Sequence, residues 1–125
     1  MAEPRAAAAA ALVRWVEAVN AYGDRAITAA AVSPAIAIER CGFGDQRGQV
    51  VQNILGLDAT VQWLAMTRDV VQFQCDVADL STTDSAWVVR YRLTAPDDFV
   101  GGGSWTIRLD PDGMLLWLRH QPDEL

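Results

Sequence analysis

Among the side chains of this 125-residue sequence that are suited to acid–base chemistry, His120 and Tyr91 lie on predicted strands. His120 is the only histidine, and the ordinary pKa of histidine, about 6.5, suits proton transfer near neutral pH. The structural alternative is a hydrogen-bonded, half-exposed histidine at the end of a strand. Strand alternation turns Tyr91 inward, where its hydroxyl donates a hydrogen bond either to a ligand oxygen or to a core carbonyl.

Aromatic side chains are numerous for so small a domain. The five tryptophans, at positions 15, 63, 87, 105 and 117, fall on five different predicted elements. We expect those at 15, 63, 87 and 105 to converge on the interior. Two interpretations remain open: the rings enclose a cavity for a flat apolar ligand, or they simply fill the core.

Other kinds of site find little support in the sequence. One histidine and two distant cysteines make no zinc site, and the acidic turn at Asp110-Pro111-Asp112 lacks the rest of a calcium loop. The glycine clusters lack the strand–loop–helix context of a phosphate cradle. We therefore expect neither a metal nor another cofactor.

The composition favours one globular domain over residues 1–125, with 51% apolar and 21% charged residues. A net charge of −6 argues against nucleic acid as a partner, and no stretch approaches the ~18 apolar residues of a membrane span. Arg14 and Glu17 interrupt the alanine-rich start, which favours a helix over a secretory signal. We therefore expect a cytoplasmic protein, with Cys41 and Cys75 as free thiols.

The first half of the chain has the periodicity of helices. Apolar residues recur at helical spacing from Leu12 to Val19, and Gly23 follows as a helix terminator. Asp24 is placed to cap a second helix. We predict helices over 4–22, 25–31 and 58–66, a strand over 35–40 and a glycine-rich loop over 41–57.

Beyond residue 70 the apolar period changes to two, which is typical of an antiparallel sheet with one buried face. The Asp-Gly pair at 112–113 is a strong hairpin signal. We predict strands over 70–80, 85–94 and 105–110, a final strand ending at His120, and turns over 79–84, 95–103 and 110–113. The order of elements predicts an α+β domain with its helices packed on one face of the sheet.

This order, together with several local phrases, resembles the nuclear transport factor 2-like superfamily, which includes SnoaL-like polyketide cyclases, ketosteroid isomerase and limonene epoxide hydrolase. The phrases are WVEAVNAYGD (15–24), a strand ending in IER (38–40), GLDATVQWL (56–64) and GGGSWTIRLDPDGMLLWLRH (101–120). They cover nearly the whole chain. Their order is specific for the fold rather than for a function, because this scaffold hosts many functions.

The resemblance implies a cystatin-like α+β cone with the element order α-α-β-α-β-β-β-β. Three N-terminal helices pack on a curved, mainly antiparallel sheet that encloses an apolar cavity open at one end. Because relatives commonly form homodimers through the outer sheet face, the resemblance also implies a homodimer. The residues that we expect on that face are Val88, Arg90, Arg92, Thr94, Thr106 and Arg108.

Enzymes similar to limonene epoxide hydrolase carry a catalytic aspartate a few residues past the Asp-Gly turn, and His120 takes that place here. Histidine in place of aspartate removes the epoxide-hydrolase mechanism but leaves a general acid or base. The count from the turn also places Leu116 and Leu118 on the face of the final strand that is turned into the cavity.

Enzymes similar to ketosteroid isomerase place a carboxylate base near the end of the first strand, where Glu39 is the nearest carboxylate. Alternation turns Glu39 away and Arg40 inward if Ile38 faces the core, unless a bulge reverses this. The structural alternative is a surface ion pair of Glu39 with Arg40 or Arg68, which stabilises little.

Two functions therefore remain open. One is a cofactor-free isomerase or cyclase for a small apolar carbonyl or cyclic compound, with His120 as the leading proton carrier, Glu39 second, and Tyr91 orienting the substrate. The other is a non-catalytic ligand-binding or dimerisation module. For both, we expect a pocket for a small apolar molecule lined by Trp15, Tyr22, Trp63, Met66, Phe73, Cys75, Trp87, Val89, Trp105, Leu116 and Leu118.

Overall fold

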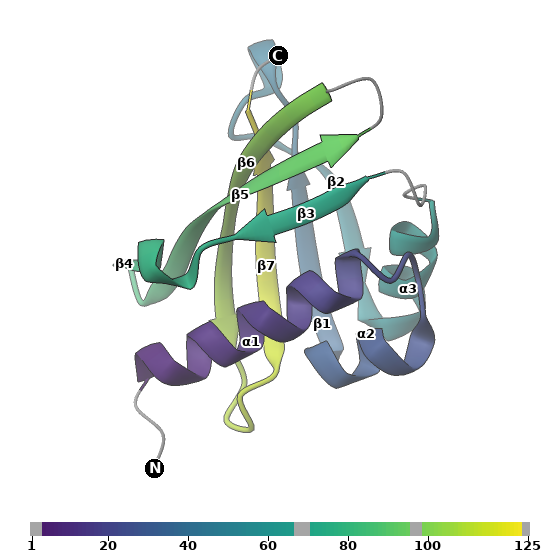
Figure 1. Cartoon of the computed structure of the whole chain (residues 1–125), viewed down its shortest axis with the longest axis vertical. Helices are drawn as coiled ribbons and strands as arrows, with labels where there is room; N and C mark the ends of the chain where they lie inside the picture. Colours follow the sequence, from purple (N-terminus) through teal and green to yellow (C-terminus); the bar gives the residue numbers. More distant parts are fainter. Residues whose placement is uncertain (1–3, 67–70, 96–98, 124–125) are drawn as a thin grey trace.

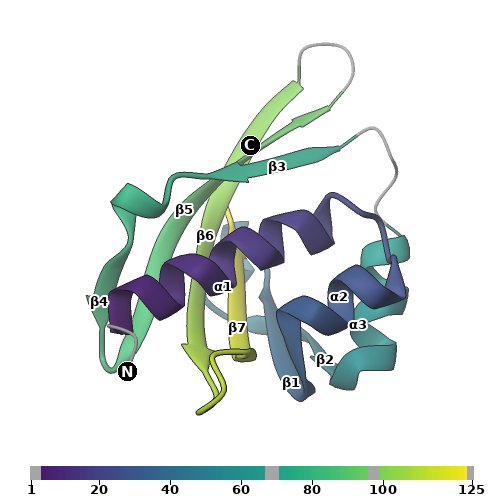
Figure 2. The same cartoon turned by 60° about the horizontal axis from the view of Figure 1, so that its bottom comes forward.

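The structure is a computed structural model that describes residues 4–66, 71–95 and 99–123. Its helices pack on the inner side of one curved sheet, with α1 running across the sheet beneath β3 (Figures 1 and 2). The helices are α1 (Pro4–Val19), α2 (Arg25–Ala31) and α3 (Gly56–Ala65). The strands are β1 (Val32–Cys41), β2 (Val50–Leu55), β3 (Gln72–Cys75), β4 (Ser81–Thr83), β5 (Ala86–Ala95), β6 (Phe99–Leu109) and β7 (Leu115–Pro122), with 3-10 turns η1 (Gly44–Gln46) and η2 (Val77–Asp79).

The strand order in the described sheet is β2-β1-β7-β6-β5-β3, and β4 also pairs with β5. Every neighbouring pair is antiparallel except β1 and β7, which run parallel. This pairing places β7 between β1 and β6, with Arg40 opposite His120. A histidine near the chain's end is therefore held in the middle of the sheet. The predicted α+β cone is confirmed, with a mainly antiparallel sheet.

Helix α1 ends at Val19, three residues before the predicted end at 22. The next residue, Asn20, acts as a strand partner: its amide donates to the Phe73 carbonyl at 2.9 Å and accepts from the Phe73 N–H at 2.7 Å. The helix end is thus fixed to the edge strand β3. Helix α2 begins as predicted, because the Asp24 carboxylate accepts a hydrogen bond from the Ile27 N–H at 3.0 Å.

The prediction of a loop over 41–57 is wrong, because this stretch contains strand β2 and the 3-10 turn η1. Strand β2 lies at the sheet edge and is exposed along most of its length, with Ile54 as its one buried residue. It therefore lacks the alternating apolar pattern by which strands are found in a sequence. The predicted strand over 70–80 is also divided, into β3 and η2, and the turn predicted over 79–84 contains β4. The element order thus gains β2 and β4, and Val70 lies outside the described residues.

Strand β6 includes the glycine run predicted as part of a turn over 95–103. The space at Gly103 explains this: a Cβ there would lie 2.3 Å from the Gln121 carbonyl oxygen and 2.6 Å from the Tyr91 hydroxyl. Glycine is therefore required for Tyr91 to lie against β6. Of the predicted turn, residues 96–98 lie outside the described residues.

Strand β7 contains a bulge, because Leu109 pairs with Leu115 while Arg108 pairs with Trp117. The extra residue is Leu116, which is 37% exposed, whereas Leu115 is fully buried. A bulge of this kind reverses the facing of the residues before it. The prediction that Leu116 faces the cavity is therefore wrong, whereas Leu118, after the bulge, is buried.

The core lies between the sheet and the helices. None of the helices in the described parts of the chain has the length and apolar character needed to span a bilayer. Cys41 and Cys75 are free, and Cys41 is fully buried. The largest fully buried side chains include Trp15, Trp105, Tyr91, Leu12, Ile36, Ile38, Ile107, Leu115 and Leu118.

Candidate functional site

The candidate site lies where the central strands meet the second half of α1. Trp105 on β6 is directly opposite His120 on β7, and Tyr91 on β5 is directly opposite Gly103 on β6. Since alternate residues of a strand share a face, Tyr91, Trp105 and His120 all point inward. Two residues predicted from the sequence to act in chemistry, His120 and Tyr91, are therefore brought together.

Tyr91 stacks on both of its neighbours. Its ring centroid lies 4.6 Å from that of Trp105, with the ring planes 18° apart, and 5.1 Å from that of His120. Trp63, on α3, approaches His120 edge-on at 6.0 Å. These contacts fix the imidazole between the sheet and helix α3.

Both imidazole nitrogens of His120 take part in hydrogen bonds. The indole Nε1 of Trp105 donates to Nδ1 at 3.1 Å, and the Tyr91 hydroxyl lies 3.0 Å from Nε2. An indole N–H only donates, so Nδ1 must be the acceptor and, in the neutral ring, Nε2 must carry the proton. His120 therefore donates to Tyr91, and its only lone pair is occupied by Trp105.

Burial, and to a lesser extent the positive charge of Arg40, lowers the pKa of His120 to about 4. Burial likewise raises the pKa of the Tyr91 hydroxyl well above its usual value. Desolvation disfavours the charged form of each group, which is imidazolium in one and phenolate in the other. Both side chains are therefore uncharged at neutral pH.

A cavity of about 110 Å³, partly open to the surface, lies beside these rings. We call it the aromatic pocket; its described lining comprises Trp15, Val19, Trp63, Leu64, Phe73, Trp105 and His120. Six of these seven side chains are apolar or aromatic, and none is charged at neutral pH. The pocket thus offers a mainly apolar lining with few polar groups.

Glu39 lies on the other face of the sheet. Its carboxylate accepts hydrogen bonds from the Trp117 indole N–H at 3.1 Å and from the Arg119 guanidinium at 3.1 Å. Ile36 and Ile38, the residues that alternate with it, are buried in the core. Glu39 is therefore separated from His120 by the sheet, and the structure does not bring it to the pocket. Arg68, considered as its ion-pair partner, lies outside the described residues.

Four of the eleven residues predicted to line the pocket do so: Trp15, Trp63, Phe73 and Trp105. Met66 is 77% exposed at the end of α3, so its assignment to the lining is wrong. Tyr22 turns away, and its hydroxyl donates to the Val71 carbonyl at 2.7 Å.

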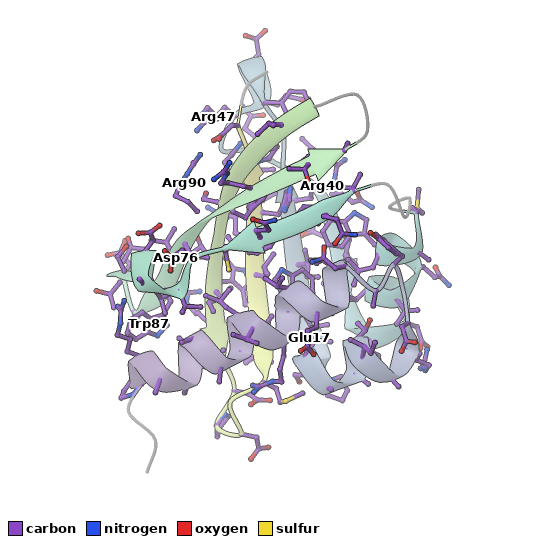
Figure 3. All side chains as sticks on the ribbon, in the orientation of Figure 1. Glu17, Arg40, Arg47, Asp76, Trp87 and Arg90 are labelled. Atoms are coloured by element: carbon purple, nitrogen blue, oxygen red, sulfur yellow. The ribbon has the colours of Figure 1, made fainter. Side chains whose placement is uncertain are left out.

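The remaining predicted lining residues lie in the core or at the surface rather than at the pocket. Val89 and Leu118 are buried in the core, and Leu116 is excluded by the bulge. Trp87 lies by β4 and the first turn of α1 (Figure 3). Cys75 borders two surface hollows instead, and burial raises the pKa of its thiol.

Val19 and Leu64 also line the pocket, and neither is among the lining residues predicted from the sequence. The sequence contains a pattern that could have identified each of them. Val19 lies one helical turn after Trp15 on the same apolar stripe, and Leu64 follows Trp63 in the helix predicted over 58–66.

No group of three or more His, Cys, Asp or Glu side chains that could hold a metal ion occurs among the residues that the structure describes. Within residues 4–66, 71–95 and 99–123, no carboxylate lines the aromatic pocket. The described arrangement can therefore enclose a neutral molecule and hold two neutral polar rings beside it.

No protein-family model matches the sequence, and no curated protein matches it. Solved structures do match. A nuclear transport factor 2-like protein of unknown function from Mesorhizobium loti superposes with a TM-score of 0.72 at 16% identity, over 99% of this chain and 97% of its own.

Two further structures are similar to this chain. A protein of the SnoaL-like family from Agrobacterium tumefaciens superposes with a TM-score of 0.73 at 13% identity, over 95% of this chain and 99% of its own. The Δ5-3-ketosteroid isomerase of a Mycobacterium species gives a TM-score of 0.63 at 21% identity, with 91% of each chain covered. Together with the strand order and the three helices, these matches identify the architecture. The chain has the nuclear transport factor 2-like fold, the cystatin-like α+β cone.

Proposed function

We propose that this protein binds a small, largely apolar cyclic molecule in the aromatic pocket. The observation that carries the proposal is the partly open cavity of about 110 Å³, lined by six apolar or aromatic side chains and one neutral histidine. A dry apolar cavity of about 150 Å³ binds benzene in another protein. The pocket here therefore suits a ring of about five or six heavy atoms.

Binding without catalysis is the form of this function that the geometry favours. General acid–base catalysis needs a group that exchanges a proton near the working pH. His120 has a pKa of about 4, and its lone pair already accepts a hydrogen bond from Trp105. Glu39, the carboxylate considered as a base, lies across the sheet. An isomerase or cyclase that uses these residues is therefore the less favoured function.

A filling variant tests the proposal. Val19→Phe places a larger side chain in the pocket, and Val13→Phe makes the same change at a position of α1 that is 52% exposed. Benzene and methylenecyclopentane are the probes, and heat-induced unfolding is the readout. A bound ligand at a hundred times its Kd stabilises the folded state by about 2.7 kcal/mol.

We expect stabilisation by at least one probe in the wild-type protein and in Val13→Phe, and none in Val19→Phe. Equal stabilisation of all three proteins would place the binding elsewhere. No stabilisation of the wild-type protein at 10 mM probe, a concentration of about 100 times a Kd of 0.1 mM, would contradict the function.

A further inference from the structure

The aromatic pocket opens to the surface on one side, and the exposure of its lining shows where. Trp63, Phe73 and His120 are half-buried, whereas the other four described lining residues are buried. The mouth of the pocket is therefore framed by helix α3, strand β3 and strand β7. A molecule whose ring lies inside the pocket can carry a polar group at this mouth.

Arg40 lies beside the mouth. It is directly opposite His120 in the parallel β1–β7 pair, and neighbouring strands lie about 4.8 Å apart. Paired residues of adjacent strands share a face, and Ile38, two residues before Arg40, is buried in the core. The Arg40 side chain is therefore on the inner face with His120, and its positive charge contributes to the low pKa of that histidine. Arg40 also remains partly exposed, so a ligand can reach it.

Arg40 has no anionic partner among the residues that the structure describes. Its Nε donates to Oε1 of Gln52, the residue opposite it on β2, at 2.9 Å. Gln52 is neutral, and the two terminal nitrogens of Arg40 make no hydrogen bond to a described residue. Glu39, the next carboxylate along the chain, is on the other face and binds Arg119. An arginine that is partly buried is usually paired, so this guanidinium is available to an anion from outside.

We propose that Arg40 binds the carboxylate of a small cyclic acid whose ring occupies the aromatic pocket. This inference rests on the proposed ligand-binding function and narrows its ligand class. The bond from Nε to Gln52 orients the guanidinium and leaves two terminal nitrogens, which can bind the two oxygens of one carboxylate. The carboxylate stays at the mouth, where water still reaches it, so its charge is not buried in the apolar lining.

Phenylacetate and phenylacetamide form a matched pair of probes, because they differ only in a carboxylate against a neutral amide. The six-atom ring suits the pocket, and the methylene group allows the polar end to extend to the mouth. Hydrogen bonds between two charged groups are stronger than neutral ones, so we expect wild-type protein to bind phenylacetate about tenfold more tightly, a factor equal to about 1.4 kcal/mol. Isothermal titration calorimetry measures both affinities.

Two variants compare the arginines of the two sheet faces. Arg40→Met removes the charge and keeps a long side chain. Arg92→Met makes the same change at an exposed arginine of β5, next to the inward-facing Tyr91 and therefore on the outer face. We expect the preference for phenylacetate to fall to about onefold in Arg40→Met and to remain in Arg92→Met. The affinity for phenylacetamide should be similar in all three proteins, because the pocket itself is unchanged.

The NMR signal of His120, the only histidine, provides an independent readout. Arg40→Met should raise the pKa of His120, because it removes a neighbouring positive charge. Phenylacetate bound to wild-type protein should also raise this pKa, because it adds a negative charge beside Arg40, whereas phenylacetamide should not. The comparison of wild-type protein with and without probe requires no substitution.

The outcomes separate the inference from the function on which it rests. A preference for phenylacetate that disappears only in Arg40→Met, with the expected changes in the His120 pKa, supports the inference. Equal affinity of wild-type protein for both probes, or a preference that persists in Arg40→Met, overturns the inference and leaves the ligand-binding function standing. If neither probe binds and benzene does not bind either, both the ligand-binding function and the inference are overturned.

Discussion

The indole N–H of Trp105 donates to Nδ1 of His120 across the β6–β7 pair, at 3.1 Å. This bond decides the chemistry of the histidine. It fixes the proton on Nε2 and occupies the lone pair that a general base would use. Protonation of His120 therefore requires burial of the positively charged imidazolium and loss of the hydrogen bond from Trp105.

We predict that His120 stays neutral down to about pH 4, the value to which burial and the charge of Arg40 lower its pKa. The unfolded chain binds this proton more readily, at a pKa of about 6.5, so the free energy of unfolding should fall as the pH drops from 6.5 towards 4. The expected loss is about 3 kcal/mol at most. Since His120 is the only histidine, one imidazole NMR signal reports its pKa, and denaturant unfolding at each pH reports stability.

The control for this prediction is His120→Asn, which does not titrate and retains an acceptor oxygen for Trp105. Its stability should change much less over the same pH range. The Arg90 ion pair lowers the pKa of Asp123, so the stability that this carboxylate contributes is lost at a lower pH. A His120 pKa near 6.5 in the folded protein would contradict the assignment.

We predict that Trp105→Phe raises the pKa of His120. The substitution removes the donor that occupies Nδ1, so a proton can bind there without breaking a hydrogen bond. Because Trp105 is 1% exposed and stacks on Tyr91, the variant should also lose about 1–3 kcal/mol of stability. The NMR titration of His120 measures the first effect, and an unchanged or lower pKa would show that the hydrogen bond does not hold the ring neutral.

We predict that Gly103→Ala destabilises the protein by about 1–3 kcal/mol, as overpacking of a core does. The added methyl group would meet the Gln121 carbonyl oxygen and the Tyr91 hydroxyl. Ser104→Ala, at the next position of β6, is the matched control and should have little effect. Chemical unfolding compares the stabilities of the two variants. Similar stability would mean that strand β6 shifts at Gly103 at little energetic cost and would contradict the prediction.

We predict that Glu39→Gln leaves ligand binding unchanged and lowers stability by less than about 1 kcal/mol. Glu39 lies on the outer face, and its ion pair with Arg119 is partly exposed to solvent. Probe affinity measured by thermal shift tests this. A large loss of probe affinity in Glu39→Gln would show that this carboxylate takes part in ligand binding, contrary to the prediction.

Homodimerisation through the outer sheet face stays a prediction. On this face Trp117 packs under the Arg108 guanidinium, 4.5 Å from the ring centroid, and contacts Glu39. We expect sedimentation to give twice the 13.6 kDa mass of the chain, and Trp117→Glu to reduce it to a monomer. Wild-type protein that sediments as a monomer at 0.1 mM would contradict the prediction.

Most of the fold could be predicted from the sequence because the strongest sequence patterns reflect local interactions. The capping by Asp24, the stripe from Leu12 to Val19 and the Asp-Gly hairpin all reflect interactions within a few residues. Features set by distant contacts could not be predicted in this way. The bulge at Leu116 depends on the pairing of β7 with β6, and the edge strand β2 has no buried face to leave an alternating pattern.

The candidate site shows the same division. The convergence of Trp15, Trp63 and Trp105 follows from the apolar patterns of their elements, and the inward direction of His120 follows from alternation. The hydrogen-bond partners of His120 do not follow from these sequence patterns. Its bonds to Trp105 and Tyr91 depend on strand register and on the space left at Gly103, neither of which a single sequence displays.

The central place of β7 has a consequence for how the protein is made. Without residues 115–122 the sheet is two separate pieces, β2-β1 and β6-β5-β3, with the inner edges of β1 and β6 unpaired. During synthesis, therefore, these two pieces cannot join through β7 until residues 115–122 have left the ribosome. We expect the nascent chain to expose two unpaired sheet edges until then, and such edges pair readily with other chains.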